Sequence, residues 1–305
     1  MHILLANPRG FCAGVNMAIK TLEAAIIRFG LPLYVYHEIV HNRWVVDDFR
    51  SRGVKFVSTI DEVPDGSRLM FSAHGVAPEI RVKASQKNIE TIDATCPLVA
   101  RVHREVLRYA ADKYKIILIG HNGHDEVIGT MNEAPESIIL VEHESDVCNL
   151  CLNESEKLVV LTQTTLSVTE TQLMIELLRK KFPQIISETN ANICYATQHR
   201  QEAITILAPL VDIVLIVGSG NSSNSKRLAE RGKALGVRSI LIDGADNIDV
   251  GWFHGGEKVL ISAGASAPEY VVRDCVKMLQ NNFNATVEER QTNTDSLSFR
   301  IPIDT

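Results

Sequence analysis

The sequence predicts an α/β fold made of three similar domains, each with a small parallel sheet, and three observations support this prediction. Short apolar, β-rich runs alternate with amphipathic helical stretches along the 305-residue chain. The segments recur in threes and in the same order. The first segment of each set ends at a single cysteine and continues as a helix. Three domains related by approximate threefold symmetry would surround one central site, which we expect to be a metal cluster.

The recurring cysteines are Cys12, Cys96 and Cys194, and helices are predicted to follow them at 15–28, 98–112 and about 195–210. The N-terminus of a helix lowers the pKa of a thiol, because its unpaired N–H groups favour the thiolate. Thiolates bind metals. Three of them would form a socket that leaves one coordination position for a substrate.

Two further kinds of segment each occur three times, and both consist of a strand, a polar loop and a helix. We expect their loops at 37–42, 120–124 and 218–224, and at 72–75, 162–165 and 262–266. Ligands bind beyond the carboxyl ends of parallel strands, which is where these loops would lie. A single such loop is an ordinary turn; the threefold order indicates a site.

The same repeat predicts the domain boundaries. We expect a first domain at 1–96, with the N-terminal strand and the Cys12 loop at the centre, a second at 97–193 and a third at 194–281. The tail at 282–305 carries no motif.

Composition limits the class of protein. Hydrophobic residues make up 45% and charged residues 22%, which is typical of a soluble globular chain. The net charge of −6 argues against nucleic acid as a partner, and no apolar run is long enough to cross a membrane. The opening residues 1–9 are too short and too soon interrupted for a secretory signal. We therefore expect a cytoplasmic protein whose six cysteines are not a disulfide framework.

The cysteine spacing favours an iron–sulfur cluster over zinc. Zinc ligands usually come in close pairs, whereas these cysteines are 84 and 98 residues apart. A [4Fe–4S] cluster with three protein thiolates leaves one iron free for a ligand. The close pair Cys148 and Cys151 lies between two predicted strands, which favours a surface or structural role, and Cys275 is predicted to be in the core.

Other loop residues predict acid–base chemistry and diphosphate binding. His41, His74 and His124 lie in loops, and Glu126 follows His124 closely enough to serve as a proton donor. His37 and His121 have no carboxylate placed in the same way. Hydroxyl and amide groups directly before helices would form a diphosphate cradle: Thr164, Thr165, Ser222, Ser223, Asn224 and Ser266. Helix caps use the same residue types, so each of these groups alone is a weak signal.

Over residues 3 to about 280, the chain resembles the 4-hydroxy-3-methylbut-2-enyl diphosphate reductase family, also called IspH or LytB. The segments that carry the resemblance are long and occur in order: 7–15, 38–42, 72–76, 93–99, 123–127, 162–167, 192–197, 222–225 and 263–268.

The resemblance implies three α/β domains around one [4Fe–4S] cluster ligated by Cys12, Cys96 and Cys194. It implies reductive removal of the allylic hydroxyl, giving isopentenyl and dimethylallyl diphosphate at the end of the non-mevalonate pathway. Glu126 would supply the proton, and Thr164 would orient the substrate hydroxyl and relay that proton. The implied diphosphate ligands are His41, His74, His124, Ser222, Ser223, Asn224 and Ser266. An electron donor such as ferredoxin or flavodoxin would be needed.

Three alternatives stay open on the residues alone. A lyase or synthase of the quinolinate synthase type would use a similar three-cysteine cluster without consuming electrons. An iron–sulfur sensor would have no need of a diphosphate cradle, and a zinc hydrolase would need different ligand spacing.

Overall fold

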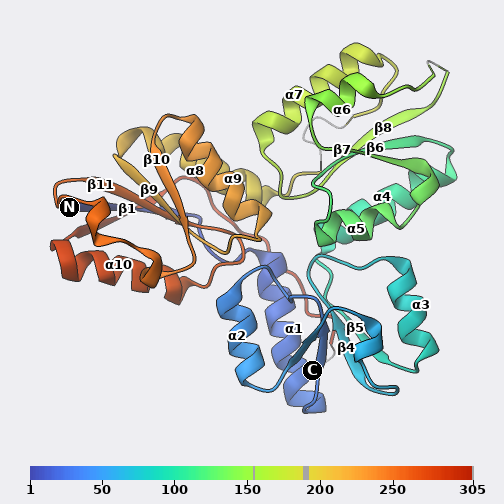
Figure 1. Cartoon of the computed structure of the whole chain (residues 1–305), viewed down its shortest axis with the longest axis horizontal. Coiled ribbons are helices and arrows are strands. Elements are labelled where there is room, and N and C mark those ends of the chain that lie inside the picture. Colours follow the sequence, from blue (N-terminus) through green and yellow to red (C-terminus); the bar gives the residue numbers. More distant parts are fainter. Residues whose placement is uncertain (154, 188–191, 304–305) are drawn as a thin grey trace. The chain divides into compact units, whose positions relative to one another are not determined.

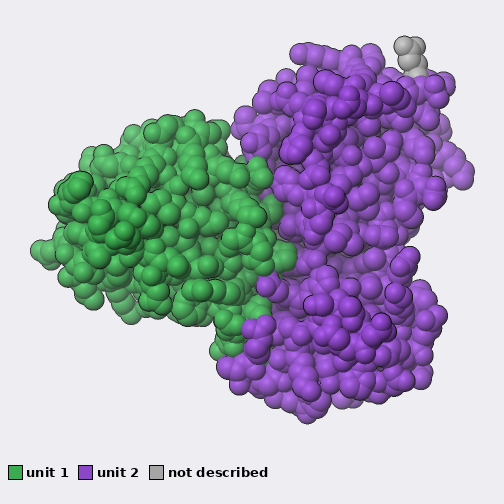
Figure 2. Space-filling view, in the orientation of Figure 1, with its two compact units in different colours: residues 1–16, 40–49, 195–298 green, residues 17–39, 50–194, 299–305 purple. Residues whose placement is uncertain are grey.

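The computed structural model of the chain describes residues 1–153, 155–187 and 192–303 and has an α/β fold with three parallel sheets. The chain forms two compact units, shown in green and purple in Figure 2. Unit 1 comprises residues 1–16, 40–49 and 195–298, and unit 2 comprises residues 17–39, 50–194 and 299–305. Unit 1 contains one sheet and unit 2 contains two, in agreement with the predicted three α/β domains.

The sheet of unit 1 has the strand order β10-β9-β11-β1-β12, and all its paired strands are parallel (Figure 1). Its strands are β1 (His2–Asn7), β9 (Ile213–Val217), β10 (Arg238–Ile242), β11 (Lys258–Ala263) and β12 (Thr286–Gln291). Its helices are α8 (Tyr195–Leu207), α9 (Ser223–Ala234) and α10 (Glu269–Phe283).

Helices cover both faces of this sheet, because its central strands are apolar at consecutive positions. Ile3 and Ile261 pack in one cluster with α10, whereas Leu4 and Leu260 pack in another with α8 and α9. Figure 1 shows α10 on one side of the sheet and α8 and α9 on the other. The sheet therefore has a core on each face, and its polar loops are left at the strand ends.

The position of β1 corrects the expectation that the first strand belongs with the segment 1–96. β1 pairs with β11 and β12 and not with the strands of unit 2. Residues 3–6 are all buried, so this strand suits the interior of a sheet, and β12 covers its other edge. The tail after residue 281, which carries no sequence motif, thus contributes a strand to this sheet.

The first sheet of unit 2 has the order β3-β2-β4-β5 and is parallel. Its strands are β2 (Tyr34–Tyr36), β3 (Lys55–Val57), β4 (Arg68–Phe71) and β5 (Glu90–Asp93). The helices of this part of the chain are α1 (Ala13–Phe29), α2 (Arg43–Ser51) and α3 (Pro78–Gln86), of which α1 starts in unit 1 and α2 lies mostly in it. One core forms where Leu69 and Phe71 of β4 pack with Ala84 of α3.

The second sheet of unit 2 has the order β7-β6-β8 and is parallel. Its strands are β6 (Lys115–Ile119), β7 (Ile138–Val141) and β8 (Leu158–Thr162), and its helices are α4 (Pro97–Ala111), α5 (Asp125–Met131), α6 (Glu144–Asn149) and α7 (Val168–Lys181). Ile117 and Val160 pack toward α7, and Ile116 and Leu161 toward α4 and α5. Most of the strand-like run expected before Cys194, residues 189–191, lies outside the described residues.

Short 3-10 helices complete the structure at Ile60–Glu62, Pro135–Ser137, Ala208–Leu210, Ala245–Asn247 and Val250–Trp252. Among the described residues, no helix combines the length and the apolar character needed to span a membrane.

Candidate active site

The three recurring cysteines have the same local geometry. Each directly precedes a helix: Cys12 precedes α1, Cys96 precedes α4 and Cys194 precedes α8. Each donates its backbone N–H, at 3.0 Å in all three cases, to a carbonyl in the loop after a neighbouring strand. The three carbonyls belong to Ala265, Ala73 and Thr164, respectively. The predicted order of strand, cysteine and helix is therefore confirmed for Cys12, after β1, and for Cys96, after β5; for Cys194 the described residues confirm only the helix.

This local geometry fits three ligands of a thiolate-bound cluster. All three cysteines are half-buried, and none of the six cysteines, which all lie in the described part of the chain, forms a disulfide. Each lies at the N-terminal end of a helix. A soft thiolate donor set suits iron–sulfur clusters better than hard cations.

The carboxylate of Glu126 is buried and bonded to one partner residue in two ways. Glu126 is only 2% exposed. Its Oε1 accepts the backbone N–H of Thr164 at 2.6 Å, and its Oε2 accepts the Thr164 hydroxyl at 2.9 Å. The carbonyl of Thr164 in turn accepts the N–H of Cys194. One threonine thus connects the proposed proton donor with a candidate cluster ligand.

His124 caps α5 and is held in one tautomer. Gly123 has a φ of +78°, a left-handed conformation that lets the loop turn into the helix. The N–H of Glu126 then donates to His124 Nδ1 at 3.2 Å. A ring nitrogen that accepts carries no proton, so the proton of a neutral His124 lies on Nε2.

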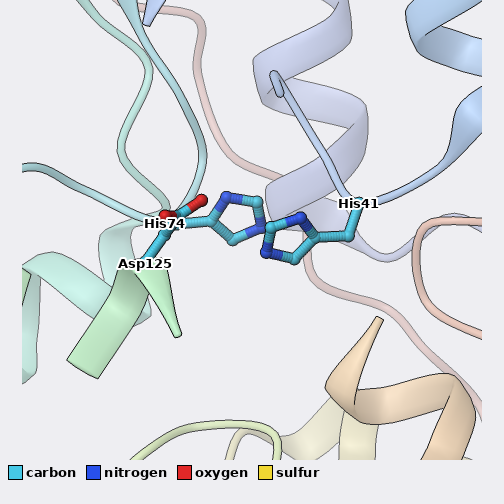
Figure 3. Close-up of side chains that lie close together, drawn as sticks. All are labelled: His41, His74 and Asp125. Carbon is cyan, nitrogen blue, oxygen red and sulfur yellow. The ribbon is translucent and has the colours of Figure 1, made fainter. Parts of the chain in front are cut away.

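His74 lies close to His124 and Asp125 within unit 2. The rings of His74 and His124 meet edge to face with centroids 6.0 Å apart. Ligand atoms of His74 and Asp125 lie within 4.8 Å of each other, and Figure 3 shows the two side chains together, from the loop after β4 and the start of α5. Ser72 Oγ lies 3.3 Å from His74 Nδ1, and this hydrogen bond helps to orient the ring.

His37 has a carboxylate partner that its neighbours in the sequence do not provide. Its Nδ1 lies 2.8 Å from Asp125 Oδ1, although the two residues are far apart in sequence. The hydrogen bond to Asp125 raises the pKa of His37 above its ordinary value of 6.5, while partial burial acts in the opposite direction. Both residues line a cleft of about 190 Å³ between the loop that follows β4 and helix α5.

In unit 1, the residues at the start of α9 include a buried side chain whose polar atoms have no hydrogen-bond partner in the described part of the chain. Ser222 caps the helix by accepting the N–H of Ser225 at 3.3 Å, and Ser222, Ser223 and Asn224 are all buried. Both side-chain polar atoms of Asn224 lack a hydrogen-bond partner in the described part of the chain. A buried amide without partners costs free energy, so the Asn224 side chain is a candidate for binding a ligand.

The end of β11 approaches the start of α9 closely, next to Ser225 and Asn224. A Cβ at Gly264, directly after β11, would overlap the Ser225 hydroxyl and lie 3.5 Å from Asn224 Nδ2. Only glycine lets α9 begin this close to the sheet. Further along the same loop, the hydroxyl of Ser266 donates to the carbonyl of His41 at 2.9 Å.

The predicted site residues therefore fall into two groups. Unit 2 contains Cys96, His74, His124, Glu126, Thr164, Thr165 and Cys194, and unit 1 contains Cys12, His41, Ser222, Ser223, Asn224 and Ser266. His41 lies in the loop before α2 and is labelled in Figure 3.

Sequence reasoning missed Gln163. This residue is 1% exposed, its Oε1 accepts the N–H of His121 at 3.0 Å, and its Nε2 donates to the Thr165 hydroxyl at 3.0 Å. It fixes the rotamer of Thr165 and joins two polar loops of the second sheet. Its place between two threonines in a recurring loop was the only available signal.

The remaining cysteines differ from the three candidate ligands. Cys148 lies in the last turn of α6, Cys151 follows that helix, and both are exposed. Cys275 is fully buried in α10, and burial raises the pKa of its thiol to about 12. These positions agree with the predicted surface and core locations.

Comparison with known proteins agrees with this geometry. Residues 3–280 match the family described as LytB protein. The 4-hydroxy-3-methylbut-2-enyl diphosphate reductase of Rhodopirellula baltica is 52% identical over 302 residues, which cover 99% of this chain and 95% of the relative. The enzyme of the same name from Pseudomonas aeruginosa is 48% identical over 306 residues, covering 99% and 98%.

Solved structures agree as well. The E-1-hydroxy-2-methyl-but-2-enyl-4-diphosphate reductase from Plasmodium falciparum matches with a TM-score of 0.96 and 39% identity, covering 99% of this chain and 95% of that one. A second reductase, described as the terminal enzyme of the non-mevalonate pathway, matches with a TM-score of 0.66 and 31% identity, covering 92% and 100%. With nearly its whole length matched, the chain belongs to the LytB family.

Proposed function

We propose that this protein is an enzyme that reduces 4-hydroxy-3-methylbut-2-enyl diphosphate to isopentenyl and dimethylallyl diphosphate, the last step of the non-mevalonate pathway. The observation that carries this proposal, beside family membership, is that Thr164 bonds both Glu126 and Cys194. The proposed proton donor and a proposed cluster ligand are thus both hydrogen-bonded to one residue. In the reaction the allylic C–O bond breaks, a C–H bond forms and water leaves, which consumes two electrons and two protons.

Three thiolates are the proposed ligands of a [4Fe–4S] cluster: Cys12, Cys96 and Cys194. When bound, such a cluster supplies the two electrons and a Lewis acid for the departing oxygen. The electrons would come from a reduced ferredoxin or flavodoxin in the reducing cytoplasm.

The proposed proton path runs from Glu126 through Thr164. In the structure the Thr164 hydroxyl donates to Glu126 Oε2. A proton on Oε2 would reverse this bond, so that Thr164 would accept from Glu126 and donate its own proton to the substrate hydroxyl. The departing group then leaves as water, which is a far better leaving group than hydroxide.

Neutral and polar donors are proposed to bind the diphosphate. In unit 2 these are His74 and His124, whose Nε2–H points away from its helix cap. In unit 1 they are Ser222, Ser223, Asn224, Ser266 and His41, arranged around the start of α9 and the loop after β11. Helix N-termini favour anions, so an acidic protein can still bind a diphosphate.

Anaerobic spectroscopy of the purified protein, with iron and sulfide analysis, tests the proposal. We expect four iron ions per chain and a cluster signal that changes when the hydroxymethylbutenyl diphosphate is added. The proposal would be contradicted if the cluster signal did not change when the compound was added, or if turnover consumed no electrons. Either result would favour an iron–sulfur lyase or synthase.

A further inference from the structure

We propose that Asp295, in the segment after β12, positions the loop that carries Cys12 by binding the buried guanidinium of Arg200. This inference rests on the proposed role of Cys12 as a cluster ligand. It assigns a role in the cluster socket to the C-terminal segment, which has no motif in the sequence.

Arg200 lies on α8 and is only 1% exposed. Its Nη1 donates to the carbonyl of Ala196 and to Asp295 Oδ2, each at 2.8 Å. Its Nη2 donates to the carbonyl of Gly10, also at 2.8 Å. Gly10 stands two residues before Cys12, so the guanidinium fixes the backbone that leads into the proposed ligand.

Both carboxylate oxygens of Asp295 contact α8 and so connect the C-terminal segment to this helix. Oδ2 accepts from Arg200, and Oδ1 lies 2.7 Å from Nδ1 of His199 on the same helix. Next to it, the Asn293 amide donates to Glu202 of α8 at 2.9 Å. The segment therefore follows α8 through three adjacent contacts.

The same segment also binds the start of the Cys12 loop. The N–H and the hydroxyl of Thr292 both donate to the carbonyl of Asn7, at 2.8 and 3.1 Å. Residues 292–295 thus contact both α8 and Asn7, while Arg200 of α8 contacts Gly10 at the other end of this stretch. We name this arrangement the C-terminal clamp.

Electrostatics explains why Asp295 matters although it does not contact the Cys12 loop. A buried guanidinium needs a carboxylate partner, because its charge is poorly solvated in the protein interior. Without Asp295, Arg200 would have to reach water, and the Gly10 carbonyl would lose its donor. The loop would then lose one of the hydrogen bonds that fix its backbone next to Cys12, beside those from Cys12 N–H to Ala265 and from Gly10 N–H to Ala263.

The other two cysteine loops have anchors that lie outside the C-terminal segment. The N–H of Thr95, next to Cys96, donates to Asp93 Oδ1 at 3.0 Å. Asn192, two residues before Cys194, exchanges two hydrogen bonds with Thr162 of β8. Asn7 and Arg9 bond to Glu289 of β12, so the Cys12 loop relies on the end of the chain in several places.

The test compares iron retention in anaerobically purified variants. Asp295→Asn keeps the shape of the side chain and removes its charge. Outer hydrogen-bond partners of metal ligands typically contribute 10–100-fold to affinity, so we expect iron release to a chelator to become about tenfold faster. We also expect an altered electron paramagnetic resonance spectrum of the reduced cluster. Arg200→Lys should behave alike, because an ammonium group cannot make the same forked contacts.

Three controls keep the outcome decisive. Asp274→Asn removes an exposed carboxylate of the same unit, 3.7 Å from Lys277, and should change nothing. Val272→Ala weakens the core of the same unit and shows what general destabilisation does to iron release. Cys12→Ser tests the ligand itself.

The outcomes separate the clamp from the proposed function. Iron retained in Cys12→Ser would refute Cys12 as a ligand. Iron lost in Cys12→Ser, but released from Asp295→Asn at the original rate and with the original spectrum, would refute the clamp alone. Faster release that matches Val272→Ala at equal loss of stability, without a spectral change, would also refute it.

Discussion

Both carboxylate oxygens of Glu126 are hydrogen-bonded to Thr164, one to its backbone N–H and the other to its hydroxyl. The residues come from the start of α5 and from the loop after β8, in one sheet domain of unit 2. This relationship fixes the rotamer of a buried acid and points one of its oxygens at a hydroxyl that can carry a proton onward.

Glu126→Gln should lower turnover by about 10²-fold or more, the usual contribution of a general acid. The amide keeps the shape of the side chain but has no proton to transfer. Iron content and substrate affinity, measured spectroscopically, should stay close to those of the original protein. Unchanged turnover would remove Glu126 from the mechanism.

Thr164→Val should lower turnover by about 10- to 100-fold, the equivalent of one hydrogen bond to a charged group. Valine has a similar shape and retains the N–H that bonds Glu126, so only the relay hydroxyl is lost. Thr164→Ser retains a hydroxyl and serves as the matched control. Steady-state rates with a chemical reductant compare the two, and equal rates would argue against a relay.

Cys96→Ser should lose the cluster, whereas Cys148→Ser should retain it. Cys96 precedes α4 at a half-buried position, but Cys148 is an exposed residue at the end of α6. Iron and sulfide analysis of both variants tests this difference. A full iron content in Cys96→Ser would contradict the proposed socket.

Asn224→Leu should weaken substrate binding without destabilising the protein. Both polar atoms of the amide are buried without partners in the described structure, so their removal relieves a desolvation cost. Loss of a hydrogen bond to a charged diphosphate should raise the dissociation constant by about 10- to 100-fold. Calorimetric binding and thermal unfolding measure both effects. A lower unfolding midpoint with unchanged affinity would assign Asn224 a structural role instead.

The His37–Asp125 pair should make stability depend on pH. Because the pKa of His37 is raised in the folded state, its contribution is fully present below the ordinary value of 6.5 and is lost as the pH rises through the folded-state pKa. His37→Gln should therefore lower the unfolding midpoint at about pH 5.5 and have little effect at about pH 9. The double variant with Asp125→Asn should lose no more than either single variant. An effect that is equal at both pH values would contradict this origin.

Local pattern in the sequence was sufficient for much of the secondary structure and for a proposal of the residue types in the candidate site. The strands Lys115–Ile119 and Ile213–Val217 end directly before the predicted polar loops 120–124 and 218–224, because a short apolar run bounded by turn residues has few alternatives in an α/β chain. The order of strand, cysteine and helix was visible for the same reason.

Tertiary structure alone decided which distant segments meet. The sequence could not show that β1 pairs with β11 and β12, because a strand that is apolar on both faces fits the interior of any parallel sheet. Nor could it show His37 against Asp125, or Arg200 between Gly10 and Asp295. Such contacts depend on chain topology and on the need to pair buried charges and polar groups, which no local spacing encodes.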